Sequence, residues 1–529
     1  MSLRMRAVAV TAGLAVSVTA CSGGTVRTAE QGGSTDKPFV YSFNLNVVTD
    51  WDPATSYSNE NIAMQNIYES LTRYDSTVKQ VKPQLATKWV SSADGKTWTF
   101  TLRDGVTFHT GRAVDSTAAK EAIERTIKKN GGPAYIWGAV KTIDTPDPHT
   151  LVFHLKYAAP LDLISSSGYA AYVYDTKAAG TADPKSWFGQ GHDAGTGPYT
   201  VASWNKGQET ELRLKAVPSY WGGWSGAHYK SIEFRDTPQV TTAWQQLRTG
   251  EVSYVQRLNP QLFAQAQHTT GIKTRSTPSF QNLIAFLNTA AGPLKDVSVR
   301  KAVQAAIDYD GLVSALKGSG TAASGVVPNG LIGATPGLGA HQNTAQATQL
   351  LNQAGYGPGK KALRLSLTYA QGDADQQTLV TLLSSALRGL NVTLDAKPMQ
   401  WDAQWAQAKA AGKRQDIFLM YWYPDYPDAY SWFLNLFHSA SPVNFNLTYL
   451  KDAGVDAAID KLPELTATNR TAAEQAYADL QRKLLTDDAV AAVAYVQTYQ
   501  RAYVTGADGY VDNPAYPNVV FAYNLRPTA

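Results

Sequence analysis

Cysteine is nearly absent from this sequence, which has a single one, Cys21, in 529 residues. A disulfide and a structural zinc site held by cysteines each need at least two thiols, so this chain can form neither within itself. Histidine offers little support for a metal, because none of the eight histidines is paired at i,i+4 spacing and no HExxH motif occurs. We therefore expect no resident metal and no cofactor.

An excess of charge of one sign is also missing. The chain carries 47 Lys+Arg against 43 Asp+Glu, a formal net charge of +4 at pH 7. Nucleic acids are usually bound through a strongly basic field, so we exclude nucleic acid as the main partner. Long apolar runs are equally scarce, and beyond the N-terminal segment the longest is the eight-residue stretch 489–496. That length fits a buried strand and is too short to cross a bilayer.

Motifs of catalysis are missing as well. The phosphate-binding pattern GxxxxGK[ST] does not occur, and the closest segment, 355–361, lacks the hydroxyl residue. The segment GWSGA at 223–227 imitates a nucleophile elbow with its second glycine misplaced. Asp425 and Asp428 could act as a glycosidase acid and base only if they faced each other across a bond. We therefore expect no enzyme, with a surface hydrolase as the alternative from another functional class.

The composition is that of a folded protein, with 44% hydrophobic, 11% aromatic and 17% charged residues. The length suggests about three domains. Apolar side chains at every second position predict strands, and apolar side chains at four-residue spacing predict amphipathic helices. The two patterns alternate and predict an α/β fold, with strands at 98–102, 151–155, 211–217 and 230–236 and helices at 115–129, 299–307, 343–355 and 471–485.

Capping residues mark the ends of several of these helices. Asp115 opens the first helix, and Gly355 is a good terminator for the helix that it follows. Thr471 and Glu474 have the spacing of a capping box, which predicts that the last helix begins there. Two turn-rich stretches mark candidate joints between domains, at 189–198 and 317–338.

The N-terminal segment has the layout of an export signal. Arg4 and Arg6 precede the uncharged run 7–20, whose 14 residues are too few to span a bilayer comfortably. The run ends in Val-Thr-Ala before Cys21, which resembles the bacterial lipobox, where the cysteine is lipidated and becomes the new N-terminus. An ordinary secretory signal with an incidental cysteine is the alternative.

These features predict a protein anchored to a membrane by lipid and located outside the cytoplasm. Residues 1–20 would be the signal peptide. Residues 21–36 would be a flexible tether, because they contain one valine and no other large apolar side chain to offset their ordering entropy.

Four separated segments, in order along the chain, resemble one known family. They are WDPATSYSNENIAMQNIYESLTRYD (51–75), LATKWVSSADGKTWTFTLRDGVTFHTGRAV (85–114), GTGPYTVASW (195–204) and LNTAAGPLKDVSVRKAVQAAIDYDGLV (287–313). The chain is similar in these segments to the family 5 extracytoplasmic solute-binding proteins of ABC importers, the group that includes oligopeptide-, dipeptide- and nickel-binding members.

The resemblance implies a two-lobed fold of the type II periplasmic-binding-protein kind, with an extra subdomain and a hinge between the lobes. The first lobe would be assembled from separate pieces of chain. Its expected parts are 37–75, 196–288 and 506–529, with the inserted subdomain at 76–195 and the second lobe at 289–505. We expect the protein to act as a monomer.

Residues 421–437, YWYPDYPDAYSWFLNLF, are unusually rich in aromatic side chains. Prolines at 424 and 427 interrupt regular structure, so the front of the segment is expected to be a loop that presents Trp422, Tyr423 and Asp425. The remaining aromatic side chains are expected to belong to the core: Tyr430, Trp432, Phe433 and Phe437.

The resemblance also implies a role for one carboxylate. In peptide-binding members an aspartate within W-x-x-D-x-x-[DE] accepts the ligand's α-ammonium, and Trp422, Asp425 and Asp428 match that pattern. Asp425 is therefore the candidate, with a structural salt bridge or helix cap as its alternative. Trp422 and Tyr423 would stack on a peptide or equally on a sugar ring. Asn44, after the first expected strand, is a further ligand candidate, with an ordinary turn asparagine as the alternative.

The leading hypothesis is a receptor that captures a short peptide between closing lobes and delivers it to an ABC permease in the membrane. The same importer role for an oligosaccharide, another polar solute or a metal chelate is the runner-up. The cation that would hold a peptide's carboxyl end remains open, because several arginines are equally eligible, including Arg364, Arg388 and Arg414.

Overall fold

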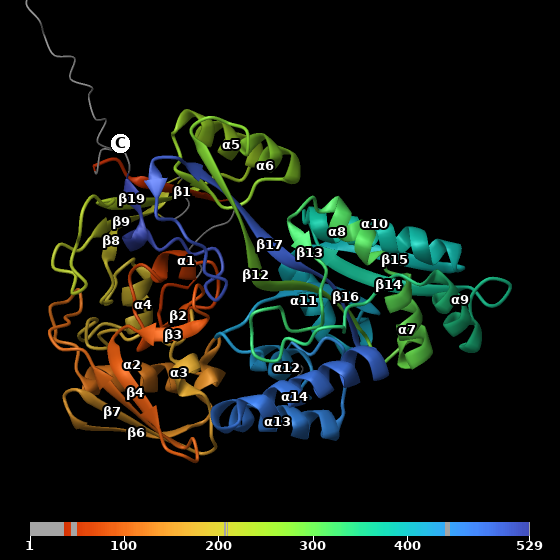
Figure 1. The fold of residues 1–529 in the computed structure, drawn as a ribbon, viewed down its shortest axis with the longest axis horizontal. Coiled ribbons are helices and arrows are strands. Elements are labelled where there is room, and N and C mark those ends of the chain that lie inside the picture. Colours follow the sequence, from red (N-terminus) through yellow and green to blue (C-terminus); the bar gives the residue numbers. More distant parts are fainter. Residues whose placement is uncertain (1–35, 44–49, 206–207, 209, 440–444, 528–529) are drawn as a thin grey trace, which may run out of the picture.

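The computed structural model describes residues 36–43, 50–205, 208, 210–439 and 445–527. Two lobes lie side by side, and two long strands run between them (Figure 1). These strands are β12 (Ile272–Leu287) and β17 (Ala491–Val504). The expected two-lobed α/β architecture is confirmed. None of the helices in the described ranges is both long and apolar enough to cross a membrane.

One mixed sheet extends through both lobes in the order β15-β14-β16-β12-β17-β11-β1-β10-β9-β8, with β13 paired to β17. In the first lobe, helices and short strands surround the part of this sheet that contains β1, β10, β9 and β8. These elements are β1 (Phe39–Phe43), β8 (Tyr199–Trp204), β9 (Thr210–Ala216), β10 (Ser231–Asp236), β11 (Tyr254–Val255), β18 (Ala507–Asp508), β19 (Arg526–Pro527), α1 (Asn61–Met64), α4 (Pro184–Gly189), α5 (Val240–Thr249), α6 (Pro260–Ala266) and the turn Ala522–Asn524.

A separate four-stranded sheet, ordered β4-β5-β7-β6, is attached to the first lobe. Its strand β5 shows the expected alternation, because Trp98, Phe100 and Leu102 are buried and the threonines between them are half-buried. Asp115 caps the adjoining helix α2 by accepting a hydrogen bond from the Ala118 backbone N–H. The elements of this part are β2 (Thr72–Asp75), β3 (Gln80–Pro83), β4 (Ala86–Ser91), β5 (Thr97–Leu102), β6 (Val140–Asp147), β7 (Thr150–Leu155), α2 (Ser116–Lys129), α3 (Leu161–Ile164) and the turn Ala134–Trp137.

The second lobe places helices on both faces of the sheet. Its elements are β13 (Gly320–Thr321), β14 (Leu363–Ala370), β15 (Val392–Met399), β16 (Ile417–Trp422), α7 (Val297–Ala306), α8 (Tyr309–Ala315), α9 (Thr344–Gln353), α10 (Ala374–Gly389), α11 (Trp401–Lys409), α12 (Tyr430–Leu436), α13 (Ala453–Thr468), α14 (Arg470–Arg482), the 3-10 helices Pro293–Lys295 and Ala411–Lys413 and the π-helix Lys483–Asp487.

Burial on both faces explains the continuous apolar runs of this lobe's central strands. Along β16, Leu419 packs into the core with α7–α10, whereas its neighbour Met420 packs into the core with α12–α14. Strands covered on both sides have no polar face, so their sequences do not alternate. The apolar run 489–496 leads into β17 and is buried as expected.

Two local expectations are corrected by the structure. Helix α14 begins at Arg470, and its N-cap is Asn469, whose side chain accepts from the Ala472 backbone N–H; Thr471 lies inside the first turn. Trp422 is the last residue of β16 and does not lie in a loop, because its backbone pairs with Asn282 of β12. The loop begins one residue later.

The predicted domain boundaries stay a proposal. Those near 288 and 505 coincide with the ends of β12 and β17, the strands that pair with elements of both lobes. The expected core aromatic residues of α12 are confirmed, since Trp432, Phe433 and Phe437 are fully buried and Tyr430 packs against them in part.

Candidate functional site

Asp425 stands at the junction of the two lobes. It follows β16 and Pro424, and its side chain is buried, with 1% of the residue exposed. Pro424 and Pro427 keep this segment out of regular structure, so the carboxylate leaves the second lobe on a short loop that the first lobe covers.

The partners of Asp425 come from both sides of the junction. The Tyr57 hydroxyl donates to Oδ1 at 3.2 Å, and the Tyr135 hydroxyl donates to Oδ2. Asn435 of α12 donates to Oδ2 at 3.5 Å and to the Tyr135 oxygen at 2.9 Å. The backbone carbonyl of Asp425 accepts from the Ser167 hydroxyl. Three side chains from the first lobe and its subdomain thus hold one residue of the second lobe.

The carboxylate of Asp425 has no cationic partner in the described part of the chain. Among the described residues, no Lys, Arg or His forms an ion pair with Asp425. Burial raises the pKa of Asp425 to about 6, and the hydrogen bonds from Tyr135 and Tyr57 lower it only in part. A buried carboxylate that lacks a counter-ion is unfavourable in its charged form, so this position would bind a cation strongly.

Asp428 is a second buried carboxylate of the same loop, with a different environment. It accepts from the Tyr477 hydroxyl and from the Tyr430 backbone N–H, both at 2.7 Å. Burial raises its pKa to about 6 as well. Because its partners belong to α12 and α14 of the same lobe, Asp428 acts as a structural anchor for the loop.

A cavity of about 550 Å³ lies beside this junction. Tyr57 belongs to its lining and also donates to Asp425, so the cavity and the carboxylate share a wall. The rest of the lining comes from the second lobe: Ala370, Asp373, Gln376, Trp401, Gln404, Trp405, Lys409, Leu419, Met420, Tyr421, Trp422, Tyr423 and Phe445. Mostly apolar and aromatic walls with a few polar groups are typical of small-ligand pockets.

Two polar groups of the lining lack hydrogen-bond partners within the described part of the chain. These are Nε1 of Trp422 and Oε1 of Gln404, both in buried side chains. Buried polar atoms are normally satisfied, so this donor and this acceptor are available to a molecule that enters the cavity.

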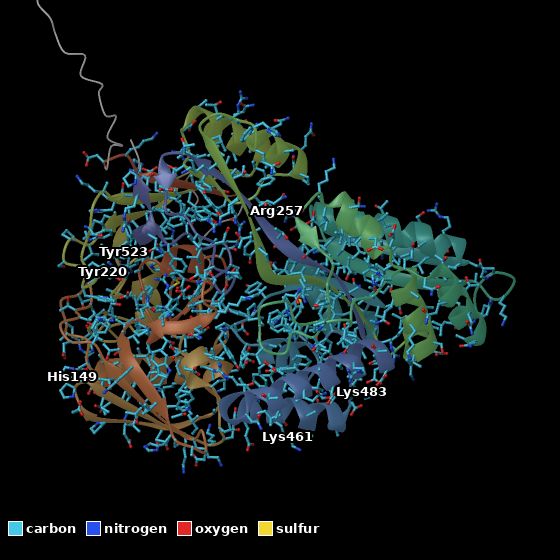
Figure 2. The ribbon with its side chains drawn as sticks, viewed as in Figure 1. His149, Tyr220, Arg257, Lys461, Lys483 and Tyr523 are labelled. Carbon is cyan, nitrogen blue, oxygen red and sulfur yellow. The ribbon has the colours of Figure 1, made fainter. Side chains whose placement is uncertain are left out.

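A second contact between the lobes lies near the crossing strands. Arg257, labelled in Figure 2, donates from Nη2 to Oδ2 of Asp375 on α10 at 2.6 Å. The Tyr495 hydroxyl of β17 donates to the same oxygen at 2.8 Å. This ion pair closes the lobes on each other beside the cavity.

The predicted site residues are placed as follows. Trp422 and Tyr423 line the cavity, and Asp425 lies directly behind Tyr57. Asn44 and Cys21 lie outside the described residues. The three arginines proposed for a peptide's carboxyl end do not line the cavity: Arg364 pairs with Asp395, Arg414 lies over the Tyr449 ring, and Arg388 stands in the last turn of α10.

Several residues of this site were not predicted from the sequence. Tyr57 and Tyr135 lie hundreds of residues from Asp425 along the chain, and no local pattern connects them. Trp401 and Trp405 were detectable in principle, because aromatic side chains four residues apart share one face of a helix. Lys409, one turn further on α11, lies 4.5 Å from the Trp405 ring centroid and completes that row.

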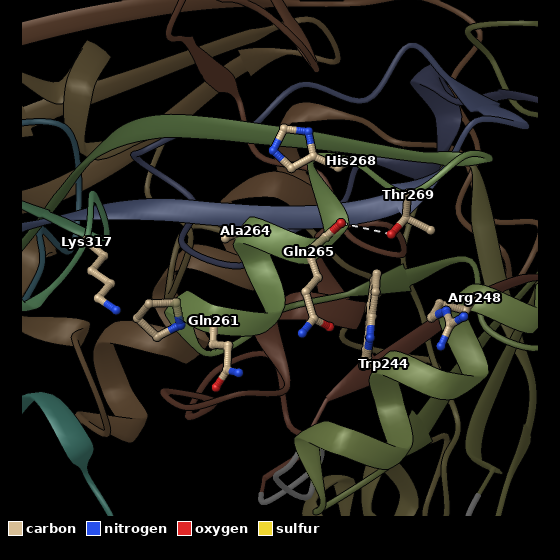
Figure 3. Close-up of a pocket in the computed structure, with 9 residues that line it drawn as sticks. Trp244, Arg248, Gln261, Ala264, Gln265, His268, Thr269 and Lys317 are labelled. Atoms are coloured by element: carbon tan, nitrogen blue, oxygen red, sulfur yellow. Dashed lines mark hydrogen bonds between the residues drawn. The ribbon is translucent and has the colours of Figure 1, made fainter.

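A larger hollow of about 870 Å³ lies away from this junction, between α5, α6 and Lys317 (Figure 3). Its lining includes Trp244, Arg248 and His268, and the Thr269 hydroxyl donates to the Gln265 carbonyl at 2.8 Å within it. Its lining includes no buried carboxylate, so we assign it no ligand. Within the described ranges, no group of three or more His, Cys, Asp and Glu could hold a metal ion.

Comparison with known proteins identifies the fold and the family. The model of the bacterial extracellular solute-binding proteins, family 5 (Middle), matches residues 80–444. The chain belongs to this family. Its members are transport binding proteins. Membership makes the chain a substrate-binding component of an ABC importer for peptides or related solutes, working outside the cytoplasm.

Similar family 5 proteins include a probable D,D-dipeptide-binding periplasmic protein, DdpA of Escherichia coli K12, 26% identical over 88% of this chain and 90% of that protein. Among solved structures, DppA of Helicobacter pylori in complex with the peptide STSA has a TM-score of 0.77, 19% identity and coverage of 96% and 100%. NikA of Brucella suis in complex with Fe(III)-EDTA has a TM-score of 0.79, 23% identity and coverage of 93% and 100%. These structures share the fold of this chain.

Proposed function

We propose that this family 5 protein is a lipid-anchored receptor that captures short peptides between its lobes and delivers them to the permease. The observation that supports it most is Asp425, a buried carboxylate without a cationic partner among the described residues, at the place where the lobes meet. A peptide's α-ammonium is the cation that this position lacks, and it would bind through charge-assisted hydrogen bonds.

Capture would work through closure of the lobes. In the structure, hydroxyl groups of Tyr57 and Tyr135 occupy both oxygens of Asp425. An ammonium that replaces one of these hydroxyl groups is attracted by the negative charge of the Asp425 carboxylate. The attraction is strong because closure of the lobes excludes water from this position. Because the ligand then contacts both lobes, it stabilises the closed form, which the permease can distinguish from the open one.

The lipid anchor is proposed from the sequence. The uncharged run before Cys21 and the apolar-poor tether after it support export and lipidation at that cysteine. Membrane fractionation of cells that express the wild type or Cys21→Ser tests it, because the variant is expected to leave the membrane fraction.

The test of the peptide site is a thermal-shift experiment on the purified protein with tripeptides, their N-acetylated forms and cello-oligosaccharides. Ligands that bind only the native state raise its melting temperature. We expect free tripeptides to raise it and N-acetylated ones to lose the effect. Asp425→Asn should weaken tripeptide binding more than tenfold, whereas Asp395→Asn, at an exposed ion pair of β15, should not. A shift with sugars alone would overturn the peptide proposal and leave the importer role standing.

A further inference from the structure

The cavity of about 550 Å³ contains a carboxylate of its own, Asp373. The cavity lies at the carboxyl ends of the parallel strands β14 and β16, and its lining includes their last residues, Ala370 and Trp422. Asp373 follows β14 and caps α10, so the fold fixes its position at the edge of the sheet where open α/β sheets bind ligands.

The described residues make hydrogen bonds to one oxygen of Asp373. Its Oδ1 accepts from the backbone N–H groups of Asp375 and Gln376 at 3.0 and 2.9 Å and from the Tyr421 hydroxyl at 3.3 Å. Its Oδ2 has no hydrogen-bond partner in the described part of the chain. The nearby Arg257 is engaged by Asp375 at 2.6 Å. Burial and the charge of Asp375 raise the pKa of Asp373, so a further cation beside it would be favourable.

The surroundings of Oδ2 suit a cationic group at the end of an aliphatic side chain. Gln404, fully buried, contributes the unpaired acceptor Oε1 to the same cavity. The stacked pair Trp401 and Trp405, with Trp401 45% exposed at the rim, offers flat faces that attract cations and cover methylene groups. Lys409 lies at the opposite end of α11 from Trp401, over the Trp405 ring, and is the cation already present in the lining.

We propose that this cavity is a second recognition site, which binds the basic side chain of a peptide ligand, lysine or arginine, at Oδ2 of Asp373. The inference rests on the proposed function, because it assigns a side chain of the peptide whose α-ammonium binds at Asp425. The two carboxylates then recognise two different cations of one ligand, with the Tyr57 ring between the cavity and Asp425.

The test is calorimetric titration of the purified protein with three pairs of tripeptides. Each pair places lysine or its neutral analogue norleucine at the first, second or third position among alanines. We expect at least one lysine peptide to bind about tenfold or more tightly than its norleucine partner, because the half-buried carboxylate of Asp373 adds a charge-assisted hydrogen bond. Asp373→Asn should abolish that preference while keeping the helix cap, since asparagine is an equally good N-cap.

A matched control is Asp402→Asn, which removes an exposed carboxylate from the first turn of α11 outside the cavity and should keep the preference. Equal binding of lysine and norleucine peptides, or a preference that survives Asp373→Asn, would overturn this inference alone. Failure of all six peptides to bind would overturn the proposed function and this inference with it.

Discussion

Burial raises the pKa of Asp425 to about 6, because the hydrogen bonds from Tyr135 and Tyr57 lower it only in part and no described cation pairs with it. The free carboxyl group of an unfolded chain titrates near pH 3.9. Between these two values the folded protein holds a proton that the unfolded chain has lost. Stability contributed by this residue is therefore greatest at low pH and falls as the pH rises through about 4 to about 6.

We expect the melting temperature of the unliganded wild type, measured relative to Asp425→Asn, to fall between about pH 4 and about pH 6. The reason is that asparagine carries no charge to desolvate, whereas the wild type must bury one. Differential scanning calorimetry at several pH values measures the difference. Asp428 is present in both proteins with a raised pKa, so its contribution to the pH dependence cancels in the difference. A difference that stays constant with pH would contradict the environment described for Asp425.

At this scale the sequence predicted the carboxylate but not its neighbours. Asp425 was proposed from the seven-residue pattern W-x-x-D-x-x-[DE], which can be recognised in the sequence without knowledge of the fold. Tyr57 and Tyr135 were not found, because their contact with Asp425 depends on how the lobes pack. Asp373 looked like any helix-capping aspartate, and it is distinguished by its place in the cavity and by an oxygen that no described residue contacts through a hydrogen bond.

At the scale of elements, the connection between α13 and α14 consists of one residue. Asn469 ends α13 as its C-cap and begins α14 as its N-cap. Helix α14 in turn carries Tyr477, which donates to Asp428 in the loop of the candidate site. The stability of the first turn of α14 is thus linked to the position of the loop that carries Asp425 and Asp428.

We expect Asn469→Ala to lower the opening free energy of the first turn of α14 by about 1 kcal/mol, because the N-cap hydrogen bond to Ala472 is lost. Hydrogen exchange of the Arg470–Arg482 segment should then be about fivefold faster. Thr471→Ala is the matched control and should leave exchange nearly unchanged. A larger effect from Thr471→Ala would favour the capping box at Thr471 and Glu474.

Elements with a regular side-chain period were predicted well, and those without one were not. The strands at 97–102 and 150–155 alternate, and α2 has both period and cap, so each was found within a residue or two. The two-residue strands β11 and β13 have no period and are defined by their pairing, β11 with β1 and β17 and β13 with β17. Trp422 was predicted to lie in a loop because prolines follow it at 424 and 427, and the sequence does not show that β16 continues up to Trp422.

At the scale of the whole molecule, the lobes are held in contact by few polar groups. Tyr57, Tyr135 and Ser167 contact Asp425, and Asn435 also donates to Tyr135. The ion pairs Arg257–Asp375 and Arg470–Asp162 and a hydrogen bond from Tyr169 to Tyr423 also join the two sides. The balance between open and closed forms depends on these contacts until a ligand adds its own.

We expect the double variant Tyr57→Phe with Tyr135→Phe to have a larger radius of gyration than the wild type without ligand, because three cross-lobe hydrogen bonds are lost. Small-angle X-ray scattering measures the difference. Tyr199→Phe, which removes a hydroxyl bonded within the first lobe to the Tyr229 carbonyl, is the control and should not change the radius. An unchanged radius in the double variant would show that these phenols do not hold the lobes together.

The paired strands β12 and β17 also determine how lobes could be exchanged between relatives. A chimaera would need one splice in each strand, and their register shifts between Pro278 and Asn282, where an irregularity interrupts the ladder. Beyond that point a splice displaced by one residue would turn every side chain to the opposite face, exchanging the residues of two cores. Grafts cut in register on both strands are the ones that preserve both cores.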